Sequence, residues 1–216
     1  MAMQTFSTDL PKIEEIVQLT GRDVLEVGCG DGRLSALLED KVGSLTAIDP
    51  DKTVITLAKK NIARVDFKVG SGENLEFADR SFDIILFSYS LHHQDCVKAL
   101  NEAKRVLKKD GRILIIEPAP DCEYTQFVSI FQEDEIDRLS TTLSHIKSGN
   151  FSIIRREIYF MEYPYTDDNE LYHHFIDSFM LKKDAEAVEK MKTILGSKKD
   201  SRPIVVRDKV NIFLLK

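Results

Sequence analysis

The sequence predicts an α/β fold in which a largely parallel sheet carries helices on both faces. Short apolar runs that are typical of buried strands alternate with segments whose apolar residues recur every three or four positions, as in amphipathic helices. Glycines fall between these segments, and none interrupts a predicted helix. Strands that alternate with helices at this spacing indicate βαβ units, which bring successive strands into one doubly wound sheet.

Five strands and four helices are predicted in the first 118 residues. The strands are 24–27, 45–48, 65–69, 82–87 and 112–116. The helices are 9–19, 34–38, 54–62 and 97–107, and Pro11 lies at an early position of the first. The pattern changes after Pro118. There the periodicity predicts helices at 121–148, 167–181 and 184–195, and strands at 151–163 and 210–215.

The composition is typical of a soluble globular chain. Its 216 residues are 43% apolar and 31% charged, with a net charge of −6, and this length can form a core without disulfides or metals. The three cysteines are odd in number and widely spaced, so they do not form a disulfide framework. No apolar run approaches the ~20 residues that span a bilayer, and the first ten residues lack the pattern of a signal peptide. We therefore expect a cytoplasmic protein without a membrane span.

Charge and aromatic residues are distributed unevenly. Residues 119–180 carry 4 basic and 12 acidic side chains, whereas 181–216 carry 10 basic and 5 acidic ones. The basic segment lacks the interleaved arginine and aromatic residues of a nucleic-acid groove, so a solvated helix face is the simpler interpretation and no nucleic-acid partner is expected. Residues 119–180 also hold 11 of the 18 aromatic residues. That surplus predicts an apolar substrate pocket, a small second core or the contact of a homodimer, and these alternatives stay open.

A glycine-rich turn between a predicted strand and a predicted helix carries the strongest functional signal. The segment VLEVGCGDG, residues 24–32, places three glycines there. Glycine lets the backbone approach a ligand, and the helix N-terminus presents free N–H groups. The spacing is G-x-G-x-G, because Arg33 stands where a dinucleotide fingerprint needs its third glycine. Glu26 beside the turn would repel a pyrophosphate and attract an ammonium group, which favours a zwitterionic, sulfonium-bearing ligand.

This segment resembles the first motif of class I S-adenosylmethionine (SAM)-dependent methyltransferases. TAIDP (46–50) is similar to the second motif, FKVGSGENLEFADRSFDIILFSYSLHH (67–93) to the segment around the third and fourth strands, and NEAKRVLKKDGRILIIEP (101–118) to the fifth-strand segment. The similarity covers about residues 23–118 and is strongest toward the subgroup typified by quinone-biosynthesis methyltransferases. It implies a Rossmann-like, seven-stranded sheet whose last strand, about 208–215, is antiparallel, with a helical cover over the strand carboxyl ends.

The resemblance also assigns SAM-binding roles. Gly28 and Gly30 would border the methionine part, Glu26 would face its ammonium group, and Ser88 would approach the methionine end. Asp49 would accept hydrogen bonds from the ribose hydroxyls, which suits a carboxylate because it only accepts.

The residues expected near the adenine follow from the same resemblance. They are Pro50, Gly72 and Glu73, and Ser71 stands where many relatives carry an aspartate. Two structural alternatives remain for the motif residues: Gly32 would only allow close helix–strand packing, and Asp49 would only cap the following helix. Cys29 is expected to fill space in the turn without acting as a nucleophile.

Methyl transfer needs an aligned acceptor in a dry pocket, and a general base only where the acceptor loses a proton. The candidate bases are Tyr89, His92 and His93, which follow the predicted fourth strand. His173 and His174 each have an acidic residue four positions away, but no third ligand stands at a fixed spacing, so no metal site is predicted. These two histidines are instead expected to line the acceptor pocket.

These features predict one SAM-dependent methyltransferase domain over residues 1–216, with a cofactor core at about 20–120 and an acceptor-side cover at about 121–200. It would transfer a methyl group from SAM to a small-molecule acceptor and release S-adenosylhomocysteine (SAH). Two alternatives stay open. In the first, the chain binds SAM or SAH as a regulatory or interaction protein without catalysis. In the second, it is a nicotinamide-dependent oxidoreductase, which the G-x-G-x-G spacing disfavours.

Overall fold

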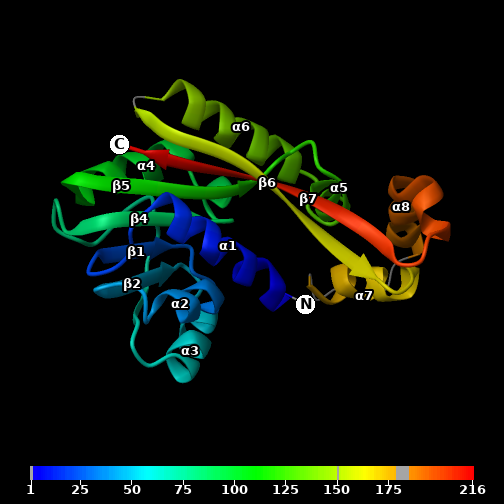
Figure 1. Ribbon diagram of the computed structural model, residues 1–216, viewed down its shortest axis with the longest axis horizontal. Coiled ribbons are helices and arrows are strands. Elements are labelled where there is room, and N and C mark those ends of the chain that lie inside the picture. The colour runs from blue at the N-terminus through cyan, green and yellow to red at the C-terminus, as the bar shows by residue number, and fades with distance from the viewer. Residues whose placement is uncertain (1, 150, 179–184) are drawn as a thin grey trace. The chain divides into compact units, whose positions relative to one another are not determined.

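A computed structural model of the chain shows one seven-stranded sheet flanked by helices (Figure 1). It describes residues 2–149, 151–178 and 185–216. The strand order across the sheet is β3-β2-β1-β4-β5-β7-β6, which confirms the predicted Rossmann-like α/β fold. The strands are β1 (Asp23–Val27), β2 (Ser44–Asp49), β3 (Asp66–Val69), β4 (Phe82–Ser88), β5 (Leu107–Pro118), β6 (Ile153–Tyr165) and β7 (Ile204–Leu215).

The first five strands run parallel to one another. β1 lies between β2 and β4, with Val24 opposite both Leu45 and Ile84, and β4 pairs with β5. Their carboxyl ends therefore meet at one edge, which is where ligand sites of open α/β sheets lie.

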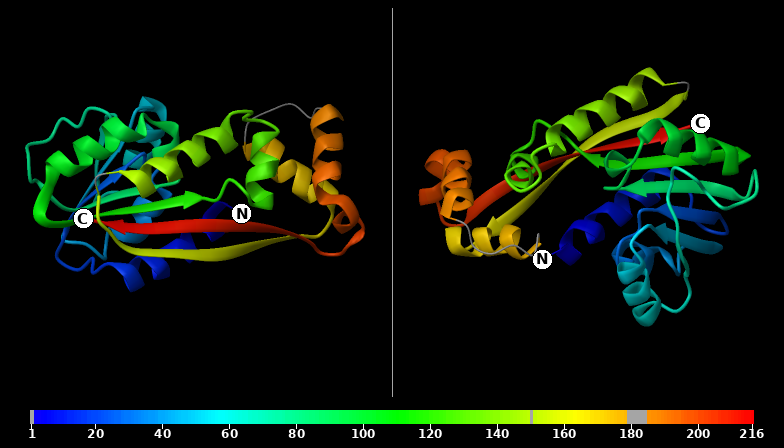
Figure 2. Two further views of the ribbon diagram at one scale, coloured as in Figure 1. Left: turned by 90° about the horizontal axis from the view of Figure 1, so that it is seen from above. Right: turned by 180° about the vertical axis from the view of Figure 1, so that it is seen from behind.

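The last strands are antiparallel, as predicted. β6 and β7 are neighbours in the sheet and run side by side (Figure 2). Next to them, Ser152 and Lys216 exchange both of their backbone hydrogen bonds at 3.0 Å, which is the pattern of an antiparallel pair.

Helices follow most of the strands. They are α1 (Ala2–Ile16), α2 (Arg33–Leu38), α3 (Lys52–Asn61), the 3₁₀ helix η1 (Leu91–His93), α4 (Cys96–Val106), α5 (Glu123–Ser129), α6 (Glu135–Ser148), α7 (Asp168–Ser178), α8 (Ala185–Leu195) and the 3₁₀ helix η2 (Gly196–Asp200). Within the described part of the chain, none of them is long and apolar enough to cross a membrane.

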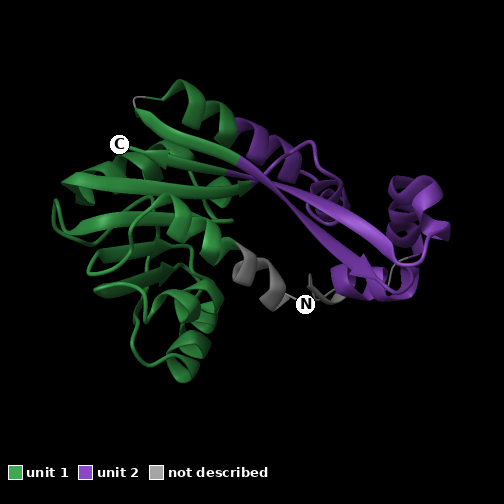
Figure 3. Cartoon of the chain, viewed as in Figure 1, with its two compact units in different colours: residues 1–117, 142–157, 212–216 green, residues 118–141, 158–211 purple. Residues whose placement is uncertain are grey.

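The chain divides into two compact units (Figure 3). Unit 1 comprises residues 1–117, 142–157 and 212–216, and unit 2 comprises residues 118–141 and 158–211. Unit 1 thus holds the parallel strands and α1 to α4. The expectation that residues 1–216 act as one domain, with a core at about 20–120 and a cover at about 121–200, stays a prediction.

Both faces of the parallel sheet are covered within unit 1. Successive side chains of a strand point to opposite faces, so β1 serves two layers. Leu25 and Val27 belong to a buried apolar cluster that includes residues of α4, such as Ala99 and Leu100. On the opposite face Glu26 is hydrogen-bonded to Ser35 of α2. The apolar run of β1 is therefore the signature of a central strand that is buried on both sides.

Unit 2 contains a small aromatic core. The ring centroids of Phe127 and Phe175 lie 5.2 Å apart, and Tyr124 lies 5.0 Å from both Phe175 and Tyr163. These separations are typical of favourable aromatic pairs. Part of the aromatic surplus after residue 118 therefore forms a second core, which is one of the alternatives that the composition left open.

The prediction of a single helix over residues 121–148 is wrong. Residues 121–148 form two helices, α5 and α6, because the backbone turns between residues 130 and 134. The Cys122 side chain accepts a hydrogen bond from Thr125 N and caps α5, and Glu135 and Asp137 lie in the first turn of α6. Acidic residues stabilise a helix N-terminus, so the acidic run that looked like the middle of a helix marks the start of a new one.

Other element boundaries also differ from the predictions. α1 begins at Ala2, so Pro11 lies in the helix interior, where proline removes one backbone donor but does not always end a helix. β5 begins at Leu107, because its register against β4 shifts between Phe82 and Ile84 and accommodates the extra residues. β7 begins at Ile204, earlier than the predicted 208 or 210, since its alternating burial extends to that residue. Parts of the predicted helices 167–181 and 184–195 lie outside the described residues.

Candidate functional site

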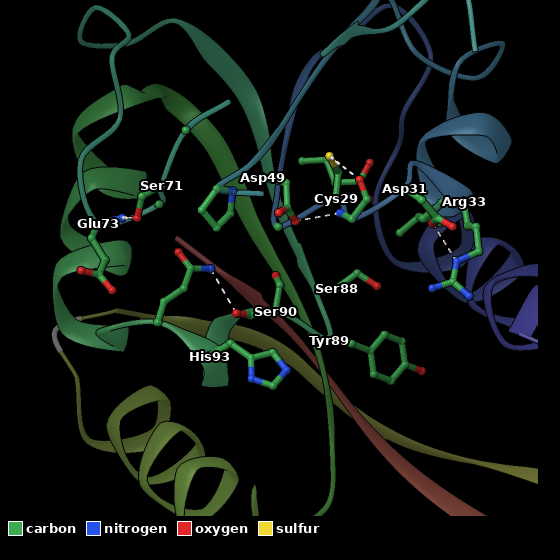
Figure 4. Close-up of a pocket in the computed structure, with 18 residues that line it drawn as sticks. Cys29, Asp31, Arg33, Asp49, Ser71, Glu73, Ser88, Tyr89, Ser90 and His93 are labelled. Carbon is green, nitrogen blue, oxygen red and sulfur yellow. Dashed lines mark hydrogen bonds and ion pairs between the residues drawn. The ribbon is translucent and has the colours of Figure 1, made fainter. Parts of the chain in front are cut away.

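A cavity of about 500 Å³ opens in unit 1 at the carboxyl ends of β1, β2 and β4 (Figure 4). Its wall comes from the turns that follow these strands and from the segment after β3. The residues that line it are Glu26, Gly28, Cys29, Gly30, Asp31, Arg33, Leu34, Asp49, Pro50, Gly70, Ser71, Gly72, Glu73, Ser88, Tyr89, Ser90, His93 and Gln94. All eight predicted cofactor-binding residues belong to this wall, together with Tyr89 and His93 of the three candidate bases.

The glycine turn between β1 and α2 forms one side of the cavity. A Cβ atom on Gly28 would lie 2.4 Å from the Ser90 Cβ atom, so the turn after β4 can pack there only against a glycine. Gly30 has a φ of +55°, and no atom of the described residues lies within 4 Å of where its Cβ atom would be. That open space faces the cavity and lets a ligand approach the backbone.

Gly32 serves packing. Its Cβ position lies 2.7 Å from Ile62 Cδ1 and 2.9 Å from Phe67 Cζ, so any side chain there would collide with the core. This geometry favours the structural alternative for Gly32 over a contact with a ligand.

Glu26 places a buried carboxylate on the cavity wall. Its side chain is 2% exposed, and Ser35 Oγ donates a 2.5 Å hydrogen bond to Glu26 Oε2. Burial raises the pKa of Glu26 to about 7; the bond from Ser35 lowers it, and the nearby Asp49 charge adds to the rise. A cationic group that enters the cavity would therefore meet a carboxyl group that ionises at neutral pH.

Asp49 ends β2 and accepts backbone hydrogen bonds on both of its oxygens. Gly30 N donates to Oδ2 and Asp51 N donates to Oδ1, each at 2.9 Å. These bonds fix the carboxylate at the cavity, and each oxygen keeps a further lone pair for a ligand hydroxyl. The N-cap of α3 is Asp51, whose side chain accepts from Thr53 N at 2.6 Å. The capping role considered for Asp49 therefore belongs to Asp51.

The segment after β3 forms the opposite wall. In the view of Figure 4, Asp49 lies between the glycine turn at Cys29 and the side chains of Ser71 and Glu73. Ser71 Oγ accepts a hydrogen bond from Glu73 N at 3.2 Å, and Glu73 Oε1 accepts one from Asp95 N at 2.8 Å. The predicted adenine-side residues are thus held by local bonds around Gly72.

Arg105 of α4 holds the loop that carries this wall. Its guanidinium donates to the carbonyl oxygens of Leu75 at 2.7 Å and Phe77 at 2.8 Å, and to Glu102 at 2.7 Å and 2.9 Å. The sequence motifs assigned no role to Arg105. The pair of Glu102 and Arg105, three residues apart on one helix, was the available signal.

Three polar residues, at the end of β4 or shortly after it, line the remaining side of the cavity. Ser88 is 7% exposed, and its hydroxyl has no hydrogen-bond partner among the residues that the structure describes. Tyr89 has a φ of +54°, and its hydroxyl donates to Asp9 Oδ1 of α1 at 3.3 Å. A non-glycine residue in this region is strained, and such strain concentrates at functional sites. His93 lies beside Ser90 at the cavity (Figure 4).

His92 does not line the cavity. It is 4% exposed, and its Nδ1 lies 2.5 Å from Glu117 Oε2. Glu117 is fully buried, and its Oε1 also accepts from Leu91 N at 2.8 Å and His92 N at 3.3 Å. Glu117 therefore holds η1, which presents His93. Sequence reasoning gave Glu117 no role, because the contact joins residues 25 positions apart.

The surroundings of Cys29 and of the histidine pair at 173 and 174 do not indicate a catalytic role. Burial raises the pKa of the Cys29 thiol well above its usual range, which disfavours a nucleophilic thiolate. In unit 2, His173 is exposed, whereas His174 Nε2 lies 3.1 Å from the Tyr124 hydroxyl and burial lowers the pKa of its ring. His174 thus belongs to the aromatic core of unit 2.

The fold and the site define a class of protein. The strand order 3-2-1-4-5-7-6 with antiparallel last strands, and a glycine turn and a strand-end aspartate around one cavity, are the features of a class I methyltransferase. Residues 25–115, less than half of the chain, match the model of the methyltransferase domain family. The cofactor of this family is SAM.

Comparisons with individual proteins agree. The chain is 37% identical to the uncharacterized methyltransferase YcgJ of Bacillus subtilis over 60% of this chain and 52% of that protein. It is 34% identical to the demethylmenaquinone methyltransferase of Thermotoga maritima over 50% and 48%. The chain thus spans about half the length of the curated relatives it matches. The crystal structure of Bacillus subtilis YcgJ superposes with a TM-score of 0.66 at 22% identity, covering 94% of this chain and 95% of that one, which shows a shared fold.

The residues around the cavity fit SAM. The ligand has an ammonium and a sulfonium at one end, a ribose in the middle and an adenine at the other end. The cavity offers a carboxyl group of suitable pKa at Glu26, an open backbone at Gly30 and a fixed carboxylate at Asp49. The Ser88 hydroxyl, which has no partner among the described residues, is a further buried group that a polar ligand would satisfy.

Proposed function

We propose that this chain transfers the methyl group of SAM to a small-molecule acceptor and releases SAH. The observation that carries the proposal is the pair of carboxyl groups, Glu26 and Asp49, which line one cavity together with the open glycine turn. One suits an ammonium group and the other a ribose diol. A nicotinamide dinucleotide would instead place a pyrophosphate at the turn, next to the Glu26 carboxyl group.

The proposed binding roles follow the order of groups along the ligand. Glu26 pairs with the ammonium group, and the backbone at Gly28 and Gly30 borders the methionine part. Ser88 contacts the methionine end, and Asp49 accepts from the ribose hydroxyls. The residues proposed around the adenine are Pro50, Gly72 and Glu73.

The chemistry of the bound cofactor is that of a methyl group activated by a positively charged sulfur. The residues of the chain then have to align the acceptor and exclude water. Where the acceptor loses a proton, we propose that Tyr89 or His93, which both line the cavity, accepts it. We propose that His92, the third candidate, instead supports η1 through Glu117.

A small, apolar acceptor is the class that the composition supports. Residues 119–180 are acidic and rich in aromatic residues, which disfavours a nucleic acid and suits a hydrophobic molecule. One relative is named as a demethylmenaquinone methyltransferase, and the acceptor in that name is an example of such a molecule. The proposed role of residues 121–200 is to form the acceptor side.

Incubation with methyl-labelled SAM and a fractionated pool of metabolites tests this function. We expect label to move into an organic-soluble product, together with one equivalent of SAH. SAM binding without any methylated product across the fractions would favour the alternative of a regulatory SAM-binding protein. Stronger thermal stabilisation by NADH than by SAM would favour the oxidoreductase.

We further propose a homodimer formed through β6, the edge strand of the sheet. Four of the seven exposed large apolar side chains of the described residues lie on this strand: Ile153, Ile154, Ile158 and Phe160. An antiparallel pairing of two copies about Tyr159 would set Ile158 against Phe160 of the other copy, and Arg156 against Glu162. Apolar and opposite-charge cross-strand pairs both stabilise such an edge contact.

Light scattering after size-exclusion chromatography tests the dimer. Phe160→Lys and Arg156→Glu should each yield monomers, because the first places a charge in the apolar contact and the second sets a like charge against Glu162 of the other copy. Leu57→Lys, at an exposed apolar residue of α3, is the control and should leave the dimer intact. A monomeric wild-type chain would contradict the proposal.

The three buried free cysteines are compatible with the proposed cytoplasmic location.

A further inference from the structure

The side-chain amide of Gln94 is only half satisfied at the cavity wall. Gln94 follows η1 and lines the cavity. Its Nε2 donates to the Ser90 carbonyl oxygen at 3.1 Å, whereas Oε1 is buried and has no hydrogen-bond partner among the described residues. The bond to a carbonyl oxygen fixes which end of the amide is nitrogen, because only the NH₂ group can donate. The orphan atom is therefore an acceptor.

Gly72 locates this acceptor. A Cβ atom on Gly72 would lie 2.2 Å from Gln94 Oε1. The amide oxygen thus lies directly against the backbone of the wall that Ser71 and Glu73 also form. The missing side chain at residue 72 is what leaves room for the amide there.

Three neighbouring side chains, in contrast, each have a hydrogen-bond partner within the protein. Ser71 Oγ accepts from Glu73 N, and Glu73 Oε1 accepts from Asp95 N. Ser90 Oγ donates to the Val27 carbonyl oxygen at 2.6 Å. An unsatisfied buried acceptor costs stability until a donor reaches it, and native proteins keep few of them. A ligand that brings an N–H group to this wall would remove that cost.

The proposed cofactor brings such a donor. With Glu26 at the ammonium group and Asp49 at the ribose, the base lies beyond Asp49, on the side of Pro50, Gly72 and Gln94. Adenine carries an exocyclic NH₂ group, whereas the corresponding 6-oxo base carries a carbonyl oxygen there. Resting on the proposed SAM site, we propose that Gln94 Oε1 accepts a hydrogen bond from the adenine amino group and selects adenine over a 6-oxopurine.

Calorimetric titration of the full chain with SAH and with S-inosylhomocysteine, in which the amine is replaced by a carbonyl, tests this role. The wild-type chain should bind SAH about ten- to a hundredfold more tightly, because two facing carbonyl oxygens leave both acceptors unpaired. Gln94→Leu keeps the approximate size but cannot accept. It should lose most of that preference, chiefly through weaker SAH binding.

Two further variants keep the test decisive. Gln94→Glu retains an acceptor and should keep the preference for SAH even if Gln94→Leu folds poorly. Gln126→Leu, at an exposed glutamine of α5, is the matched control and should behave as the wild type. Gln94→Leu with an unchanged ratio of the two affinities would overturn the role of Gln94 while leaving the SAM site intact. A wild-type chain that binds neither ligand would overturn the proposed cofactor itself.

Discussion

The hydroxyl of Ser35 donates a 2.5 Å hydrogen bond to the buried carboxyl group of Glu26, whose pKa burial raises to about 7. The pair joins α2 to β1 behind the glycine turn, so it fixes the acidic group at the cavity. A carboxyl group held in this way is close to half ionised at neutral pH. Two consequences can be measured, one on ligand binding and one on stability.

We expect the binding of SAH to weaken as the pH falls below 7. The ligand's ammonium group pairs with ionised Glu26, so protonated Glu26 must first release its proton. Below the pKa this costs up to about tenfold in affinity for each pH unit. Titration calorimetry between pH 8 and 5.5 should show this slope, together with proton release on binding. Glu26→Gln should bind weakly without the slope; a pH-independent wild-type affinity would rule out the pairing.

Glu26→Gln should also stabilise the free protein at alkaline pH. The folded-state pKa of Glu26 is higher than that of the unfolded chain, near 4.5, so the folded state holds this proton more tightly. The wild-type chain therefore loses stability as the pH rises through 7, by up to roughly 3 kcal/mol for this group. Urea unfolding at pH 8 should show a more stable variant, and at pH 5 the difference should shrink. Glu76→Gln, at an exposed glutamate, should change neither. A variant less stable than the wild type at pH 8 would mean that Ser35 compensates the burial.

Asp49 and Asp51 form a natural pair of test and control. Asp49→Ala removes the acceptor proposed for the ribose hydroxyls and should weaken SAH binding by about a hundredfold, because bonds to charged groups are strong. Asp51→Ala removes only the cap of α3, so it should lower the melting temperature and leave the affinity nearly unchanged. Calorimetry and thermal unfolding of both variants separate the roles. Equal affinities for the two variants would show that the ribose assignment is wrong.

Much of this site was predictable because its signals are local. The turn around Gly28 and the aspartate that ends β2 stand in short motifs, and the alternation of strands and helices predicts that their strand ends meet at one edge. The bonds that Glu117 accepts from His92 and the position of the Gln94 amide against Gly72 were missed for the opposite reason. Each contact joins side chains from separate turns, so it cannot be predicted from the spacing of residues in the sequence.

The break between α5 and α6 shows a second limit. Apolar residues such as Phe127 and Phe131 continue the helical period across it, so periodicity alone predicts one helix. The chain ends α5 and starts α6 because caps and acidic first turns favour two short helices. Whether such a segment forms one helix or two depends on how it packs within unit 2.

Arg105→Lys should loosen the wall of the cavity. Lysine cannot reach the carbonyl oxygens of Leu75 and Phe77 and the Glu102 carboxylate at once, because it lacks the planar fork of arginine. Backbone amides of residues 71–80 should exchange with deuterium faster, and SAH binding should weaken severalfold. Arg64→Lys, at a well-exposed arginine, is the control. Unchanged exchange in this loop would show that α4 does not hold it.

Gly30→Ala and Gly32→Ala should show which glycine is needed for ligand binding and which for core packing. Both residues have positive φ, so each alanine pays about 1 kcal/mol of backbone strain. Gly30→Ala adds only a methyl group facing the cavity, and it should weaken SAH binding by about tenfold or more with little further loss of stability. Gly32→Ala places its methyl group against Ile62 and Phe67, and overpacking should cost about 1–3 kcal/mol more.

Urea unfolding and calorimetry on the same preparations of these two variants give the answer. If Gly30→Ala keeps full affinity, no ligand approaches the turn there, and the open space has another cause. If Gly32→Ala is as stable as Gly30→Ala, the core around Phe67 yields and Gly32 is not needed for packing. The expected result is a stable variant that binds poorly and an unstable variant that binds well when folded, because the two glycines face the cavity and the core respectively.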